Sequence, residues 1–250
     1  MDPHRPNWPY PRVIAHRGGG ALAPENTLAA CALARKLGFR AVEFDAKLSS
    51  DGRVILMHDD TLGRTTNGMG AVASKTYQTL SRLDAGSWFA NEFTGEPIPT
   101  LAAACALCRE TGLWANIEIK PCPGRERETG AAVARESRLL WAGAAPPPVL
   151  SSFSIEALQA AKEHAPELPR GMLFDRVPAD WRAILAALGC ASLHANFRAL
   201  SRDLVEDLHQ AGYGVLAYTV NDSEHALELA QWQVDALCTD ALDVVTPGFL

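Results

Sequence analysis

Hydrophobic and polar positions follow two alternating patterns along almost the whole chain. Short runs rich in apolar and β-branched residues predict eight strands, at Arg12–His16, Ala41–Lys47, Trp114–Lys120, Val149–Phe153, Arg170–Phe174, Ala191–Ala195, Gly214–Val220 and Val234–Thr239. Stretches rich in Ala and Leu with helical periodicity predict seven helices, at Asn26–Leu37, Leu101–Glu110, Arg127–Leu140, Ile155–His164, Ala179–Leu188, Arg202–Gln210 and Asp222–Gln231. Such alternation favours parallel pairing with right-handed crossovers. Eight strands in 250 residues predict an α/β fold, a closed (β/α)8 TIM barrel rather than an open doubly wound sheet.

One interval breaks this alternation. Some fifty residues lie between the second predicted strand and the second predicted helix, and within them Arg53–His58 predicts an extra strand after a turn. A structureless loop of that length is unusual in a compact domain. We therefore expect a small insertion, at about residues 50–99, over the C-terminal mouth of the barrel. The expected organisation is an N-terminal arm of residues 1–11 followed by a barrel domain of residues 12–250.

The charge and composition exclude several classes of protein. The chain has 23 Lys+Arg and 29 Asp+Glu, a net charge of −6, which disfavours binding to nucleic acid or to an anionic membrane. No apolar run reaches the ~18 residues of a membrane-spanning helix, and the first twelve residues lack the apolar core of a secretion signal. We expect a cytoplasmic protein with no nucleic-acid partner and no stable membrane association. The sequence is compatible with a monomer or a homodimer.

Six cysteines are present, and two of them form a C-x-x-C pair, Cys105 and Cys108. No second pair follows at zinc-binding spacing. Because they are spaced i and i+3 within a predicted helix, both should lie on one buried face. We expect free, buried thiols of the kind found in a reducing compartment.

Acidic residues recur on the predicted strands with a spacing of two. Glu43 and Asp45 share one face of a strand, and Asn116, Glu118 and Lys120 share one face of the next barrel strand. Burying neighbouring carboxylates without a cation is costly. Three carboxylates meeting at one mouth suit a divalent metal, Mg²⁺ or Ca²⁺, better than zinc. Surface salt bridges at strand ends are the alternative.

Two histidines end predicted strands. His16 is followed by Arg17 and three consecutive glycines at positions 18–20, and His58 is followed by two aspartates. The C-terminal ends of barrel strands form the catalytic face, where two imidazoles can serve as acid and base near neutral pH. Arg17 offers a bidentate fork for phosphate oxygens, and the glycines let backbone N–H groups approach an anion. Structural roles are the alternative for each histidine; His194, also near a strand end, is expected to line the mouth.

Several catalytic motifs are absent from the sequence. There is no G-x-S-x-G elbow, no Walker loop, and no G-x-G-x-x-G between a strand and a helix. Serine hydrolases, P-loop NTPases and dinucleotide-dependent enzymes are therefore disfavoured.

Together these residues resemble the glycerophosphodiester phosphodiesterase family, from about Arg12 to Asp240. The motifs that carry the resemblance are His16-Arg17-Gly18, Pro24-Glu25-Asn26-Thr27, Glu43-Phe44-Asp45, Asp51-Gly52-Arg53-Val54, His58-Asp59, Asn116-Ile117-Glu118-Ile119-Lys120-Pro121, Ser151-Ser152-Phe153, Tyr218-Thr219-Val220-Asn221, Val234-Asp235-Ala236 and Thr239-Asp240. The set of H-R-G with P-E-N-T, E-x-D and H-D, at these spacings, is highly specific. The insertion also resembles the family's extra domain after the second barrel strand.

The resemblance implies roles for individual residues. It implies that the acid/base pair is His16 and His58, that the metal ligands are Glu43, Asp45 and Glu118, and that the phosphate contacts are Arg17 and Lys120. Tyr218 stands where the family often has Trp. For this position the resemblance implies a contact with the glycerol moiety or packing at the mouth. Phe153 and Trp88 are candidate apolar walls of the pocket, with core packing an equal alternative.

The implied activity is metal-dependent hydrolysis of small glycerophosphodiesters to sn-glycerol 3-phosphate and an alcohol. The nucleophile is either the neighbouring glycerol hydroxyl, through a cyclic phosphodiester, or a metal-bound water. Two other functions remain: a lipid-cleaving relative of phospholipase C or D, and a catalytically silent sugar-phosphate binder. The chain shows no basic amphipathic segment for binding a bilayer, and it retains both histidines and all three carboxylates.

Overall fold

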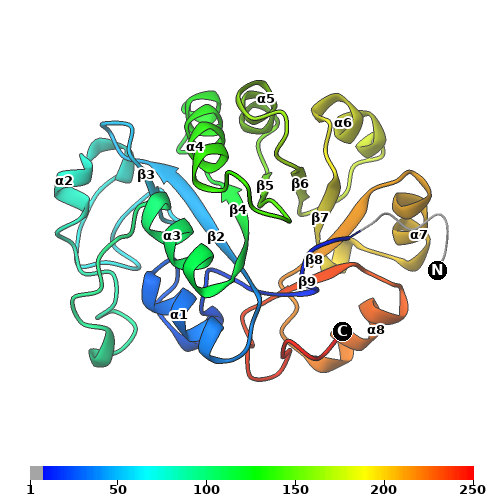
Figure 1. Cartoon of the computed structure of the whole chain (residues 1–250), viewed down its shortest axis with the longest axis horizontal. Helices are drawn as coiled ribbons and strands as arrows, with labels where there is room; N and C mark the ends of the chain where they lie inside the picture. Colours follow the sequence, from blue (N-terminus) through cyan, green and yellow to red (C-terminus); the bar gives the residue numbers. More distant parts are fainter. Residues whose placement is uncertain (1–7) are drawn as a thin grey trace.

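Eight parallel strands close into a barrel in the computed structural model, which describes residues 8–250 (Figure 1). The barrel strands are β1 (Val13–Ala15), β2 (Ala41–Leu48), β4 (Trp114–Ile119), β5 (Val149–Ser152), β6 (Arg170–Phe174), β7 (Ser192–Asn196), β8 (Gly214–Tyr218) and β9 (Ala236–Thr239). Pairing follows the chain order from β4 to β9 and then β1, and β1 closes the ring on β2 with Ala15 opposite Val42. The predicted TIM barrel is confirmed.

The helices between the strands form an outer layer (Figure 1). They are α1 (Leu28–Lys36), α3 (Leu101–Thr111), α4 (Glu126–Leu140), α5 (Ile155–His164), α6 (Trp181–Leu188), α7 (Arg202–Gln210) and α8 (Ser223–Gln231). Most begin at a side chain that accepts the backbone N–H three residues on, as Thr27, Ser154 and Asp222 do. The first helix therefore starts two residues later than predicted: Thr27 caps it and Asn26 has a left-handed φ of 60°.

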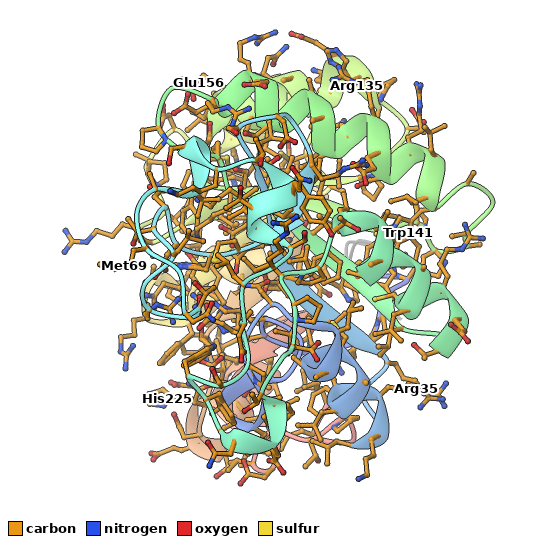
Figure 2. The ribbon with its side chains drawn as sticks, turned by 90° about the vertical axis from the view of Figure 1, so that its left-hand side faces the viewer. Arg35, Met69, Arg135, Trp141, Glu156 and His225 are labelled. Atoms are coloured by element: carbon orange, nitrogen blue, oxygen red, sulfur yellow. The ribbon has the colours of Figure 1, made fainter. Side chains whose placement is uncertain are left out.

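The segment between β2 and α3 has its own small core. Strand β3 (Val54–Leu56) pairs antiparallel with β2, and α2 (Tyr77–Leu80) follows it. Apolar side chains of the segment pack together beside the barrel: Ile55, Met57, Leu62, Val72, Leu80, Ala85 and Ile98. Figure 2 faces this segment, from which the 84% exposed Met69 projects into solvent.

The interior of the barrel is apolar at its N-terminal end. Inward-facing side chains fill it there, including Ile14, Trp114 and Leu216, and Trp8 and Tyr10 pack against them from below. The Tyr10 and Trp114 rings lie 4.5 Å apart. Residues 1–7 of the predicted arm lie outside the described residues. The acidic and cationic side chains predicted for the site lie at the opposite, C-terminal end of the strands.

All six cysteines are buried and free, as predicted, and Cys105 and Cys108 lie on the inner face of α3. Within residues 8–250, no helix combines the length and apolar character needed to cross a bilayer.

Replacing Gly171 on β6 with Ala should destabilise the barrel. A Cβ there would lie 2.6 Å from Cε1 of the His194 ring, which is 1% exposed and has little room to move. We expect the free energy of unfolding to fall by about 1–3 kcal/mol, measured by denaturant titration. Gly63→Ala, where a Cβ meets no atom within 4 Å, is the control. Equal midpoints for the two variants would contradict this packing.

Candidate active site

A cavity of about 400 Å³ opens at the C-terminal ends of the barrel strands. It brings together ten of the residues that the sequence singled out for the site, namely His16, Arg17, Glu43, Asp45, His58, Glu118, Lys120, Phe153, His194 and Tyr218. Trp88 lies elsewhere: its ring packs edge-on against Phe89 in the segment after β3, and its N–H donates to the carbonyl of Ala85. The interpretation of Trp88 as a pocket wall was wrong.

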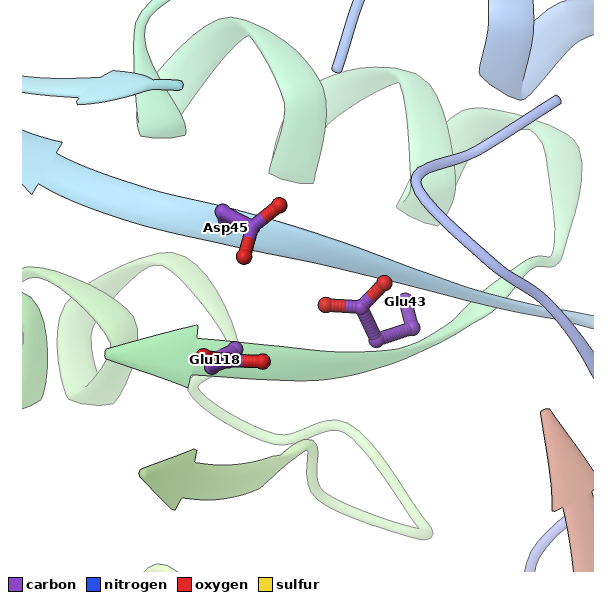
Figure 3. Close-up of side chains that lie close together, drawn as sticks. All are labelled: Glu43, Asp45 and Glu118. Atoms are coloured by element: carbon purple, nitrogen blue, oxygen red, sulfur yellow. The ribbon is translucent and has the colours of Figure 1, made fainter. Parts of the chain in front are cut away.

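Three carboxylates from adjacent strands form the acidic side of the cavity (Figure 3). Glu43 and Asp45 come from β2, and Glu118 comes from β4, where it is paired in register with Asp45. Each offers an oxygen within 4.8 Å of the others, and all three are at most 8% exposed. Oε1 of Glu43 is buried with no hydrogen-bond partner. An all-oxygen donor set with an unsatisfied buried oxygen fits a hard divalent cation.

Mutual repulsion and burial disturb the protonation of these carboxylates. Burial, together with the charge of Asp45, raises the pKa of Glu43 to about 8 and that of Glu118 to about 7. Burial also opposes ionisation of Asp45, but Lys120, His58 and Arg17 outweigh it and lower the pKa of Asp45 below its ordinary value. One carboxylate is thus ionised by its cationic neighbours, and two retain protons into the neutral range.

Each candidate acid/base histidine is held by a carboxylate through Nδ1. In His16, Nδ1 lies 2.6 Å from Oδ1 of Asp240, and Nε2 lies 3.8 Å from Oε2 of Glu43. In His58, Nδ1 lies 2.8 Å from Oδ1 of Asp59. An ionised carboxylate accepts a hydrogen bond, so both rings carry a hydrogen on Nδ1 and leave Nε2 for chemistry.

The two imidazoles have opposite pKa shifts. Burial lowers the pKa of His58 and outweighs the opposing influence of Asp45 and Asp59. Burial also disfavours protonation of His16, but the hydrogen bond to Asp240 and the charge of Glu43 raise its pKa overall.

Sequence reasoning gave no role to Asp240, although it is the last residue of a motif quoted above. Its backbone N–H donates to Oδ1 of Asn221 at 2.8 Å, which fixes the loop after β9 beside His16. A carboxylate directly after a barrel strand was the available signal.

The two candidate phosphate-binding cations are paired with carboxylates. Arg17 donates from NH1 to Glu25 at 2.8 Å, and Lys120 donates from Nζ to Glu118 at 2.7 Å. Part of the expectation for the glycine triplet was wrong: the N–H groups of Gly18 and Gly20 donate to the carbonyls of Glu43 and His16. The Gly18 N–H thus ties the loop to β2 and the Gly20 N–H closes a turn, so neither donor is free for an anion.

Aromatic side chains form the outer wall of the cavity, and His194 forms part of its floor. Phe153, 40% exposed, lies edge-on to Tyr218 with ring centroids 6.0 Å apart, and Lys120 Nζ lies 5.2 Å from the Phe153 ring centroid. His194 is the middle residue of β7. Its ring turns into the barrel, where Nε2 lies 2.9 Å from Oγ of Ser192, so it lies below the mouth. Burial lowers the pKa of His194 to about 3, so it is neutral.

Comparison with known proteins identifies the family of this chain. Residues 16–244 match the sequence profile of the Glycerophosphoryl diester phosphodiesterase family. The chain belongs to this family. A glycerophosphodiester phosphodiesterase of Caldanaerobacter subterraneus subsp. tengcongensis is 34% identical over 91% of this chain and 93% of its own length. A putative glycerophosphodiester phosphodiesterase of Bacillus subtilis is 33% identical over 93% of this chain and 96% of its own length.

A solved structure agrees with this assignment to the glycerophosphoryl diester phosphodiesterase family. A phosphodiesterase of Oleispira antarctica, in complex with the product sn-glycerol-3-phosphate, superposes with a TM-score of 0.87. It is 42% identical and covers 93% of this chain and 94% of that one. The resemblance found in the sequence is confirmed, and the chain is a phosphoric diester hydrolase.

Binding of a divalent cation should depend steeply on pH. Because the carboxyl pKa values of Glu43 and Glu118 are raised to about 8 and about 7, protons compete with the cation below those values. Affinity for Mg²⁺ or Ca²⁺ should therefore rise, by about 500-fold between pH 6 and pH 8 if both glutamates must lose their protons. Calorimetry in two buffers of different ionisation heat measures both affinity and proton release. A constant affinity without proton release would contradict the coupling.

Proposed function

We propose that the chain hydrolyses small glycerophosphodiesters to sn-glycerol 3-phosphate and an alcohol, with a divalent metal and a histidine pair. The observation that carries this proposal is the convergence of three carboxylates, two imidazoles and two cations in one cavity. The Oleispira antarctica relative with bound sn-glycerol-3-phosphate supports this choice of product.

The substrate phosphate is held between cations. Arg17 and Lys120 lie on either side of Asp45, at 3.7 and 3.8 Å, and their guanidinium and ammonium groups face the cavity. With a divalent ion held by Glu43, Asp45 and Glu118, the formal charge there is about +1, which suits a monoanionic diester. The apolar wall of Phe153 and Tyr218 contacts the carbon chain of the substrate.

The bound metal, Mg²⁺ or Ca²⁺, supplies Lewis-acid stabilisation of the charge that grows on the phosphoryl oxygens. Arg17 and Lys120 share that load through hydrogen bonds. One histidine accepts a proton at Nε2 from the nucleophile, which is the adjacent glycerol hydroxyl or a water molecule. As the new P–O bond forms, the P–O bond to the alcohol breaks, and the other histidine donates a proton to the departing oxygen. Attack by water gives sn-glycerol 3-phosphate directly. Attack by the glycerol hydroxyl gives a cyclic phosphodiester, which a water molecule then opens in a second step: a new P–O bond to water forms, the ring P–O bond breaks, and the two histidines exchange their acid and base roles.

Activity should require both the metal and the two histidines. A chelator should abolish release of glycerol 3-phosphate from a panel of glycerophosphodiesters, and Mg²⁺ or Ca²⁺ should restore it. His16→Ala and His58→Ala should each lower kcat about 10²- to 10⁴-fold. His164→Ala, on α5 and outside the cavity, is the control and should retain activity.

Two results would refute this proposal. Full turnover in chelator would remove the metal from the reaction. Wild-type rates in both histidine variants would remove the acid/base pair.

A further inference from the structure

Arg64, in the segment after β3, lies next to the active-site cavity without lining it. Its guanidinium contacts two carboxylates at once. NH1 and NH2 of Arg64 donate to Glu25 at 2.7 Å each, and Nε and NH2 donate to Asp59 at 2.7 and 2.9 Å. Both contacts are two-pronged, the geometry in which arginine–carboxylate pairs are strongest and most directional.

Each of these carboxylates also holds one group of the proposed active site. Oε1 of Glu25, which accepts from Arg64, accepts a second hydrogen bond from NH1 of Arg17 at 2.8 Å. Oδ1 of Asp59 likewise accepts from Arg64 and lies 2.8 Å from Nδ1 of His58. The loop after β1 and the loop after β3 are thereby joined through one side chain.

We propose that Arg64 is a positioning residue that fixes Arg17 through Glu25 and His58 through Asp59. The proposal rests on the function proposed above. Arg64 does not line the active-site cavity, so it acts through these two carboxylates and does not contact the substrate.

Arg64 also determines how much negative charge His58 meets. The charged groups that influence His58 are Asp59 beside it, Asp45 on β2, Arg17 after β1 and Lys120 after β4. The cationic fork of Arg64 neutralises Asp59, and its hydrogen bonds lower the pKa of that carboxyl. Asp59 therefore orients the His58 ring but stabilises the protonated imidazole only weakly. Without Arg64, the full charge of Asp59 would act on the imidazole and favour protonation.

The first test follows the His58 ring by NMR titration of the protein with Mg²⁺ present, its signal being assigned by its loss in His58→Gln. In Arg64→Gln, His58 should titrate at a pH higher by about 1 unit. The double variant Arg64→Gln/Asp59→Asn should reverse that rise, because the charge of Asp59 is gone. Arg82→Gln, an exposed arginine of the same segment, is the matched control and should change nothing.

The second test measures catalysis. In Arg64→Gln, kcat/KM should fall about 10- to 100-fold, because two groups lose their fixed orientation. One limb of the pH–rate profile should move to higher pH, whether His58 is the acid or the base. Arg64→Lys keeps the charge but cannot form both forks, so it should keep the wild-type limbs and still lose most of the rate. Glu25→Gln should weaken binding of glycerol 3-phosphate, because Arg17 loses its partner, and should move the His58 titration less than Arg64→Gln does, because Arg64 still pairs with Asp59.

The outcomes separate this proposal from the function itself. Unchanged His58 titration with wild-type kcat/KM in Arg64→Gln would refute the positioning role. If circular dichroism shows that Arg64→Gln does not fold, wild-type kcat/KM in Arg64→Lys would refute it instead. If the chain hydrolyses no glycerophosphodiester, the proposed function fails, and the NMR titration still decides whether Arg64 controls His58.

Discussion

Repulsion among three buried carboxylates is the constraint on which the rest of the site depends. Glu43, Asp45 and Glu118 place oxygens within 4.8 Å of one another at the end of a low-dielectric barrel interior. Such a cluster is stable only if cations or protons compensate it. Arg17 and Lys120 compensate the charge of Asp45 in part. The negative charge that they leave uncompensated raises the pKa values of Glu43 and Glu118. The same uncompensated negative charge favours binding of a divalent cation.

Charges of alternating sign surround this cluster. The acidic centre is flanked by Arg17, Lys120, His16 and His58, and three of these four are held from outside by further carboxylates. The outer carboxylates are held in turn by further groups. Glu25 and Asp59 both accept hydrogen bonds from Arg64, and the backbone N–H of Asp240 donates to Asn221. A functional side chain whose second hydrogen-bonding group is already occupied has few orientations left, so the site is organised before substrate arrives.

The barrel supplies the geometry for this arrangement. Apolar side chains fill the N-terminal end of its interior, with Trp8 and Tyr10 against them, so polar groups on the same strand faces gather at the other end. The segment after β3 has its own apolar core and contributes Arg64 and Asp59 to the network. Its packing beside the barrel therefore bears directly on the chemistry of the site.

Much of the fold and the inner part of the site followed from the sequence alone, because they depend on local periodicity. A spacing of two places Glu43 with Asp45 on one strand face, and His16, which directly follows barrel strand β1, lies at the mouth. The same local rules gave the strands, the helices and the shared buried face of Cys105 and Cys108.

Tertiary structure decided which groups hold these side chains. His16 and Asp240 are 224 residues apart in the chain, and Arg64 and Glu25 are 39 apart, so only closure of the barrel and packing of the segment after β3 bring them together. The inward turn of the His194 ring and the hydrogen bond from the Gly18 N–H to the carbonyl of Glu43 on β2 were also set by packing. A strand pattern specifies which face a side chain occupies; its hydrogen-bond partner depends on which distant segment the folded chain places opposite it.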